Sequence, residues 1–541
     1  MSRLPDKPAD SEHKMPSEHP DKRELALVFL VFLAAALTSL LFCNHNSPFY
    51  RFSSNPDANA YMGVARALRH GLMPYRDVFD HKGLLLYLIN YVATLLSPES
   101  LTGIYLILSV LLAAFLWYGY RIARMLLAKL PALVATFPLL FFSVGNRNFF
   151  LGGGSTEEYL MPCLMACLFY LIRSFQFAEN NNEITSRQFF LDSVATGFFC
   201  GVMLWIKYTS IPAVGMAFLA LYIYLFSIKS GSIAFRSLLG VFLGAFFISV
   251  PCLLFLWKND LFKEMWSVYI TFNISYNNGD VAARHTLENL PFLYAAIPFI
   301  IASLLGLPFL YVQQKSKMFS KVGFLAVLLH TVICIFIVMV FGRYYPYYFL
   351  AIIHPLIFTT TACIQFFLSR QISRKLFGLS KSAKIIISVL LIIFFMSLTV
   401  FSAVQDWKKW SVIAHKTEME YYADAVNEYW ALNGDGSAPK MIFFMSMDRG
   451  LLQLCDTYPQ HRFYYTPNAG EETGISIGKE QFGYIEEGTV DFIVVDVGDM
   501  FTDLFTKTNT PYRPIKIPGV FLNERNQYCN IYVKVDREDD P

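Results

Sequence analysis

The sequence predicts an all-α polytopic membrane domain followed by a small C-terminal α/β domain, and three observations support this fold class. Apolar residues make up 55% of the 541-residue chain and charged residues 16%, whereas soluble domains usually carry about 25% charged residues. Apolar runs of about 20 residues, the length that crosses a bilayer, recur as far as residue 404. Beyond residue 404 the apolar runs become short and of strand type, with turn residues between them.

The apolar runs predict about eleven transmembrane helices in a domain that covers residues 23–404. They lie near 24–43, 101–122, 131–150, 159–176, 190–207, 210–228, 235–257, 291–312, 322–342, 345–368 and 384–404. The first run has no small-x-small cleavage site, so we expect an uncleaved span and not a signal peptide. The apolar segment 84–96 is too short to span, and we expect an amphipathic helix in the membrane interface.

Lysine and arginine in the short connections predict the orientation of the chain. Alternate connections are rich in these residues, which places the polar and disordered tail 1–22 in the cytoplasm. The first outer loop, 44–100, is an exception because it carries five basic residues on the outer side: Arg51, Arg66, Arg69, Arg76 and Lys82. These charges indicate a task other than topology. The chain is thus predicted to be a multi-pass protein of the cytoplasmic (inner) membrane with an extracytoplasmic C-terminal domain.

The C-terminal domain, 405–541, is predicted to open with a helix over 408–432 that ends at an Asn-Gly-Asp-Gly breaker. Strands are expected at 441–445, 490–495 and 528–535, with a short helix near 450–455. Cys455 and Cys529 either form one disulfide or stay reduced, since only geometry decides. The net charge of +3 gives no basis for a nucleic-acid partner.

The most unusual stretch is the polar loop 55–87, which lies between two apolar segments. Asp57 stands near the start of a short helix predicted over 58–70, with Tyr61 on its apolar stripe. Asp57 is either a helix cap or a general base that takes a proton from an acceptor hydroxyl. Further on, Asp80, His81 and Lys82 precede a glycine and an apolar helix. Lys82 can face a phosphate, while Asp80 and His81 orient it, relay a proton or bind a divalent ion.

Three further patches are predicted to lie on the same outer side. Glu157 and Glu158 follow three glycines, and they either stabilise a helix N-terminus or supply a second carboxylate. Arg343 and Tyr344 end the ninth run, as part of an aromatic belt or as a phosphate contact. Lys207 either snorkels to the interface or binds phosphate. His354, deep in the tenth run, is expected to be a hydrogen-bonded core histidine.

The stretches DANAY and GLMPYRDVFDHKGLLLY resemble the polyprenyl-phosphate-sugar-dependent glycosyltransferases of the GT-C superfamily. This group includes protein O-mannosyltransferases, the aminoarabinose transferase acting on lipid A, and bacterial transferases that modify teichoic acid or lipopolysaccharide. GGGSTEEY and GRYYPYY are looser matches. The resemblance implies a GT-C type membrane domain and an inverting transfer at the outer face. The donor is a sugar on a polyprenyl phosphate, whose chain lies among the spans.

The resemblance also implies roles for individual residues. Asp57 matches the aspartate that aligns the acceptor, Lys82 matches the lysine that holds the donor phosphate, and Asp80 matches the acid before it. The second acidic position fits Glu157 or Glu158, and the late basic-tyrosine motif fits Arg343 and Tyr344. Leu84 stands where many relatives show proline after the glycine. A divalent cation is considered as a cofactor, with Asp57, Asp80 and His81 as its candidate ligands.

Two other classes of function compete with the transferase. A transporter or flippase for lipid-linked glycans is disfavoured because no predicted span carries several midplane acids or bases. A polymerase or ligase of lipid-linked glycans is the other alternative. The predicted partners are a polyprenyl-phosphate sugar, membrane lipid and a glycan, lipid or protein acceptor. The sequence leaves the sugar and the acceptor open.

Overall fold

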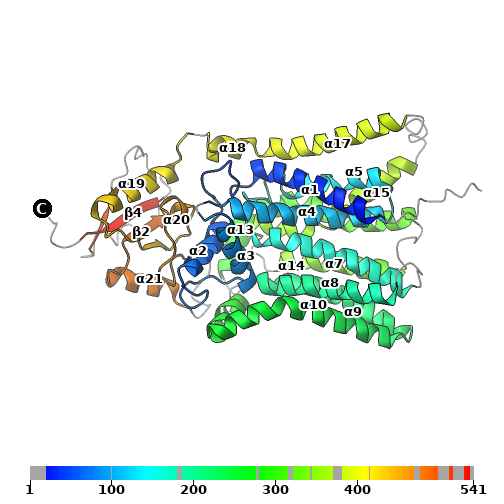
Figure 1. The fold of residues 1–541 in the computed structure, drawn as a ribbon, viewed down its shortest axis with the longest axis horizontal. Helices are drawn as coiled ribbons and strands as arrows, with labels where there is room; N and C mark the ends of the chain where they lie inside the picture. The colour runs from blue at the N-terminus through cyan, green and yellow to red at the C-terminus, as the bar shows by residue number, and fades with distance from the viewer. Residues whose placement is uncertain are drawn as a thin grey trace, which may run out of the picture.

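A bundle of long helices forms most of the computed structural model, with a small sheet domain at one end (Figure 1). The structure describes residues 20–98, 100–179, 185–275, 280–314, 321–340, 344–369, 380–413, 415–467, 475–496, 511–515 and 529–535. Most of the predicted tail 1–22 therefore lies outside the described residues. The all-α membrane domain and the C-terminal α/β domain of the predicted fold class are both confirmed.

Among the described residues, nine helices are long and apolar enough to cross a membrane. They are α1 (Lys22–Cys43), α4 (Thr102–Arg124), α7 (Thr156–Ala178), α8 (Ser186–Ile206), α9 (Ile211–Ser227) with the 3-10 turn η1 (Tyr208–Ser210) before it, α10 (Gly231–Lys258), α13 (Asp280–Gln314), α14 (Lys321–Val340) and α17 (Lys381–Ser402). A further bent pair, η3 (Pro346–Ile352) and α15 (Leu356–Ser369), meets at an angle of 55° and forms either a broken tenth span or a re-entrant loop.

The third predicted run, 131–150, forms no helix of spanning length. It gives two short helices, α5 (Lys129–Thr136) and α6 (Pro138–Ser143). Proline is favoured in the first turn of a helix and disfavoured inside one, so Pro138 starts a new helix after Phe137. Together the two cover only 129–143, and the count of about eleven spans is corrected to nine or ten among the described helices.

Close helix packing in the bundle depends on small residues, as is usual in membranes. At the contact between α8 and α10, a Cβ atom on Gly197 would lie 1.9 Å from the carbonyl oxygen of Val241. A Cβ on Gly244 would lie equally close to the carbonyl oxygen of Val194. These glycines therefore allow the two backbones to touch, which fixes the end of α8 relative to its neighbours.

Two short helices lie between the bundle and the C-terminal domain, as Figure 1 shows: α2 (Pro56–Arg69) and α3 (Leu84–Leu96). The helical segments predicted at 58–70 and 84–96 are thus confirmed. The N-cap of α2 is Asn55, whose side chain accepts a hydrogen bond from the N–H of Asp57. The capping role considered for Asp57 therefore belongs to Asn55, and the Asp57 carboxylate does not act as the N-cap of α2.

The C-terminal domain contains a four-stranded sheet of order β1-β2-β4-β3. Its strands are β1 (Met441–Phe444), β2 (Phe492–Asp496), β3 (Tyr512–Pro514) and β4 (Cys529–Lys534). β1 and β2 are parallel, whereas β4 is antiparallel to both β2 and β3. The three predicted strands are confirmed, and β3 is an addition of only three residues. Cys455 and Cys529, both described, form no disulfide.

The helices of this domain differ in part from the prediction. The expected helix 408–432 is two helices, α18 (Val404–Trp410) and α19 (Glu418–Asn433). The break is set by Thr417, which opens α19 with a capping box completed by Glu420. α20 (Leu451–Leu454) matches the expected short helix, while α21 (Ile477–Glu486) was not predicted.

The C-terminal domain packs on α2 and the loop that follows it. The hydroxyl of Tyr464 donates to the carbonyl of Ala60, and the N–H of Phe79 donates to the carbonyl of Arg462. α2 is therefore buried on almost all sides, with nine of its 14 residues buried. The apolar stripe predicted for this helix is thus part of a larger buried surface, to which the C-terminal domain contributes.

Candidate active site

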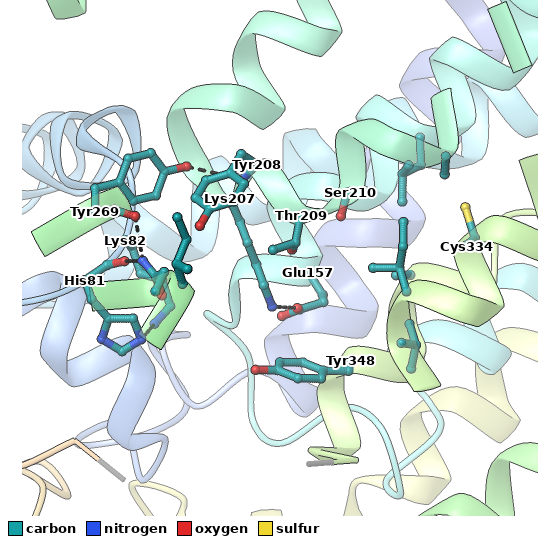
Figure 2. A pocket seen from close by; sticks show the side chains of 17 residues that line it. His81, Lys82, Glu157, Lys207, Tyr208, Thr209, Ser210, Tyr269, Cys334 and Tyr348 are labelled. Carbon is teal, nitrogen blue, oxygen red and sulfur yellow. Dashed lines mark hydrogen bonds and ion pairs between the residues drawn. The ribbon is translucent and has the colours of Figure 1, made fainter. Parts of the chain in front are cut away.

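A cavity of about 360 Å³ lies where the opening loop meets the ends of the membrane helices. Polar side chains from separate parts of the chain line one portion of it, as Figure 2 shows: His81, Lys82, Glu157, Lys207, Tyr269, Asn273 and Tyr348. The remaining wall is largely apolar and comes from membrane helices: Leu164, Ala213, Cys334, Ile337 and Val338. The cavity thus joins a cationic end to an apolar one.

Lys82 is positioned through its backbone. Its carbonyl accepts hydrogen bonds from the hydroxyls of Tyr75 and Tyr87, at 2.9 and 3.1 Å, and its N–H donates to the Tyr87 oxygen. The next residue, Gly83, donates its N–H to the carbonyl of Ile206 at the end of α8. A Cβ on Gly83 would lie 2.1 Å from the Trp205 carbonyl oxygen, so only glycine fits this joint. The joint brings Lys82 next to the residue that follows α8.

The side chain of Lys82 belongs to a chain of polar groups. Its Nζ donates to Nε2 of His81 at 2.7 Å, so Nε2 accepts through its lone pair and carries no proton. Nδ1 of His81 faces Oδ1 of Asp80 at 3.7 Å, longer than a hydrogen bond. Asn273 donates to the His81 carbonyl and holds the backbone of this segment. His81 therefore orients the lysine toward the cavity.

Asp80 lies behind this chain and is only 2% exposed. Its Oδ1 accepts hydrogen bonds from the His81 N–H and from the hydroxyl of Tyr465, which comes from the C-terminal domain. Its Oδ2 is buried and accepts no hydrogen bond from the described residues. Burial raises the pKa of Asp80, while the charge of Lys82 and the bond from Tyr465 oppose that shift.

Lys207 is positioned by its side chain. Its Nζ forms an ion pair with Oε1 of Glu157 and lies 3.9 Å from the centre of the Tyr348 ring. The lysine and glutamate side chains are 18% and 4% exposed. Burial lowers the pKa of Lys207, and Lys82 acts in the same direction, while the Glu157 carboxylate opposes both. A ligand phosphate at this end would add a second negative charge and favour the protonated lysine.

The two neighbouring glutamates have different tasks. Glu158 completes a capping box with Ser155 at the start of α7. This is the structural one of the two roles considered for these acids, stabilisation of a helix N-terminus. Glu157 instead faces the cavity and pairs with Lys207. Gly152, Gly153 and Gly154 precede them with φ of +82°, +88° and +94°, a region that favours glycine.

Asp57 does not line the cavity, although it lies close to it. Its charge is among the causes that shift the pKa values of both Asp80 and Lys207. One carboxylate oxygen, Oδ2, is buried and accepts no hydrogen bond from the described residues. Tyr61, one turn along α2, is 1% exposed, and Lys82 Nζ lies 5.8 Å from its ring centre. The helix thus presents a carboxylate beside the cationic end.

The structure therefore brings together four predicted site residues in the cavity wall: His81, Lys82, Glu157 and Lys207. Asp57, Asp80, Glu158 and Tyr61 lie around it, and Arg343 falls outside the described residues. From the late tyrosine motif, Tyr348 lines the cavity and Tyr344 does not. Tyr465 and Asn273 were missed because neither stands in a motif, and only the fold brings them to the loop.

The three candidate ligands of a divalent cation, Asp57, Asp80 and His81, are not among the groups whose donor atoms converge. Within the described part of the chain, one group of three such side chains does converge, and it lies elsewhere: His330, Cys334 and His354. Oδ2 of Asp57 and Oδ2 of Asp80 are buried and accept no hydrogen bond from the described residues, and the divalent cation expected from the sequence stays a prediction.

The long apolar helices make the chain a multi-pass membrane protein, and its fold agrees with the fold class expected from the sequence. The fold is similar to that of ArnT from Cupriavidus metallidurans bound to undecaprenyl phosphate, at 14% identity and a TM-score of 0.58, over 96% of this chain and 99% of that one. The apo state of the same protein matches at 12% identity and a TM-score of 0.59, over 95% and 98%.

A further structure, the archaeal oligosaccharyltransferase AglB from Archaeoglobus fulgidus with an inhibitory peptide and a dolichol-phosphate, matches at 13% identity. Its TM-score is 0.49 over 88% of this chain and 70% of that one, and nothing below depends on it. No protein-family model matches the chain, and no curated protein matches it. At these identities the likeness shows the fold, and function rests on the chain's own residues.

Proposed function

We propose that the protein transfers a sugar from a polyprenyl-phosphate donor to an acceptor at the outer face of the cytoplasmic membrane. The acceptor class is an envelope glycan, a lipid or a protein, and the loop 44–100 and the C-terminal domain lie outside. The observation that carries the proposal is the shape of the cavity wall. Lys82 and Lys207 provide positive charge at one end, and membrane helices provide an apolar wall at the other. A phosphate that carries a long hydrocarbon chain fits this combination.

The proposed reaction is an inverting displacement. An acceptor hydroxyl attacks the anomeric carbon of the sugar, and the bond between that carbon and the phosphate oxygen breaks. The electron pair leaves with the polyprenyl phosphate, whose developing charge is met by Lys82 and Lys207 in a poorly hydrated site. Asp57 takes the acceptor proton, since its buried Oδ2 accepts no hydrogen bond from the described residues.

The supporting residues have distinct tasks in this scheme. His81 accepts from Lys82 and directs its ammonium group, and Asp80 with Tyr465 fixes the backbone before it. Glu157 orients Lys207. A divalent cation, if the donor phosphate brings one, would be held by Asp57 or Asp80 and would neutralise phosphate charge. The described side chains alone do not build a full ligand set for it there.

The test uses the purified full chain with radiolabelled undecaprenyl-phosphate sugars and an envelope lipid extract. A labelled product is expected from the unchanged chain. Lys82→Ala and Asp57→Asn should each reduce turnover at least a hundredfold, because each removes a group that acts in the transition state. The matched controls are Arg76→Ala and Asp77→Asn, which change the same charges in the same loop but pair with each other outside the cavity.

Full activity of Asp57→Asn would contradict the general-base role. Product formation that survives both substitutions would contradict the proposed site as a whole. The transporter alternative predicts movement of the intact labelled lipid between leaflets without cleavage of the sugar–phosphate bond. Mass spectrometry of the lipid after incubation separates these two outcomes.

A further inference from the structure

Three buried side chains form a cluster in the membrane domain, and one of them, Cys334, also lines the cavity. His330 and Cys334 stand one turn apart on α14, and His354 stands at the break between η3 and α15. Their exposed fractions are 1%, 4% and 0%. One nitrogen from each histidine and the cysteine sulfur lie within 4.8 Å of one another.

The two histidines present a conflict if nothing lies between them. Nδ1 of His354 is 2.9 Å from the carbonyl of Ala351, and Nδ1 of His330 is 3.2 Å from the carbonyl of Ala213. A carbonyl oxygen only accepts, so both Nδ1 atoms carry their protons. Each neutral ring then has a lone pair on Nε2. Yet the two Nε2 atoms face each other at 2.8 Å, where two lone pairs repel.

We propose that His330, Cys334 and His354 bind a thiophilic d¹⁰ metal ion, Zn²⁺ or Cu⁺. Such an ion takes both Nε2 lone pairs and the Cys334 thiolate, which turns the repulsion into coordination. The carbonyl partners of Nδ1 are what metal-bound histidines commonly have, because they fix the tautomer that leaves Nε2 available. His354 is the buried, hydrogen-bonded histidine that the sequence predicts, and its Nε2 is the atom that would bind the ion.

The spacing requires only a small adjustment. In a tetrahedral site with Zn–N bonds of about 2.0–2.1 Å, two ligand nitrogens lie roughly 3.3 Å apart. The Nε2 atoms would therefore separate by about half an ångström from their 2.8 Å. The sulfur of Cys334 is 3.8 Å from Nε2 of His330, and a single ion can span that distance.

The net charge of the metal site depends on the ion, and its position beside the cavity allows a fourth ligand to enter. The described cluster contains no carboxylate. With one thiolate, Cu⁺ gives a neutral site, whereas Zn²⁺ leaves one positive charge that an anionic fourth ligand would balance. Cys334 also lines the cavity, so this ligand can enter from there. The bound ion would tie α14 to the break in the neighbouring span.

The experiment measures metal in the purified full-length chain in detergent, without an affinity tag that binds metals. Elemental analysis after dialysis should find about one equivalent of zinc or copper, and the element identifies which of the two ions is native. Reconstitution with Co²⁺ after chelation should give a sulfur-to-cobalt charge-transfer band. Cys334→Ser should lose that band, and His330→Gln should lower metal retention at least tenfold.

The matched control is Cys363→Ser, an exposed cysteine on α15, which should retain both metal and band. Size-exclusion profiles identify variants that remain folded. The proposal is overturned if the folded unchanged chain retains less than a tenth of an equivalent of every such ion and gains no thermal stability from added Zn²⁺ or Cu⁺. The two histidines would then share a proton. It is also overturned if His330→Gln and Cys334→Ser bind as much metal as the unchanged chain. These outcomes do not depend on glycosyl transfer.

Discussion

The two lysines of the cavity are positioned in opposite ways. Lys82 is fixed through its backbone, by two tyrosine hydroxyls and by the contact of Gly83 with the end of α8. Behind it, the C-terminal domain supplies Tyr465 to Asp80. Lys207 follows directly after α8 and is oriented by its ion pair with Glu157, with the Tyr348 ring beside it.

The position of Lys82 is therefore set by its backbone, whereas the position of Lys207 is set by its own charge and that of Glu157. On the Lys82 side, tyrosine hydroxyls and the Gly83 contact hold the loop through its backbone, so the loop does not depend on the ammonium group for its position. On the Lys207 side, the charges themselves hold the arrangement, and removal of one leaves the other buried and uncompensated. Substitutions on the two sides should therefore differ in stability even where they weaken phosphate binding alike.

The largest expected effect comes from breaking the ion pair. Glu157→Gln or Lys207→Met should each destabilise the protein by about 3–5 kcal/mol, because each leaves one buried charge without its partner. The double variant should be more stable than the sum of the two losses predicts. Lys82→Met, on the other side, should cost less than either, because Asp80, the carboxylate that Lys82 faces, also accepts two hydrogen bonds. Thermal unfolding in detergent measures all four, and strict additivity of the two losses would show that the pair is not coupled.

The next effect concerns the domain that supports the Lys82 side. Burial raises the pKa of Asp448 to about 6, although backbone N–H groups of Gly450 and Leu451 donate to it. Its carbonyl accepts from Asn59 on α2, so it lies at the contact with the opening loop.

Because the folded-state pKa of Asp448 lies above its ordinary value, its contribution to stability is largest below about pH 4 and is lost as the pH rises through about 6. The span of about two pKa units corresponds to about 3 kcal/mol. Asp448→Asn should remove this fall in melting temperature between pH 4 and 7. The exposed Glu428→Gln on α19 should leave it in place. An unchanged profile in Asp448→Asn would assign the dependence to other groups.

A smaller effect is expected where the two sides join. Gly83→Ala places a methyl group against the Trp205 carbonyl and forces the Lys82 loop away from α8. Such overpacking costs about 1–3 kcal/mol. The dissociation constant of undecaprenyl phosphate should rise with it, as measured by titration in detergent. Gly215→Ala on α9 adds the same methyl where nothing lies within 4 Å, and it should change neither quantity. If the two variants have the same stability and the same dissociation constant, the contact between Gly83 and α8 does not position Lys82.

The smallest predicted effect tests the link between the domain and Asp80. Tyr465→Phe removes a donor to the Asp80 carboxylate and should raise its pKa further, at a cost of about 1 kcal/mol. The acid limb of the pH–rate profile should therefore move to higher pH. Tyr464→Phe removes a hydroxyl that donates to Ala60 instead, and its profile should stay in place. If the acid limb of the Tyr465→Phe profile does not move, the protonation of Asp80 does not affect the reaction.

The sequence predicted well whatever depends on neighbouring residues. Apolar runs located the long helices, and the acids after the glycine loop predicted the capping box that Glu158 completes. It failed where one residue starts a new helix within a longer pattern, as Pro138 does for α6 and Thr417 for α19. The loop 55–87 was singled out by its charges, and His81 and Lys82 indeed line the cavity.

By itself the sequence determined the fold class, the positions of the spans and the chemical groups available at the outer loops, because periodicity and composition act over a few turns of chain. Only the tertiary structure decided which of these groups meet. The Gly83 contact brings Lys82 and Lys207 to one cavity, and Tyr465 donates to Asp80 across 385 residues. His354 meets His330 and Cys334 at the bend between η3 and α15. Such encounters depend on how distant segments pack, and no local pattern encodes them.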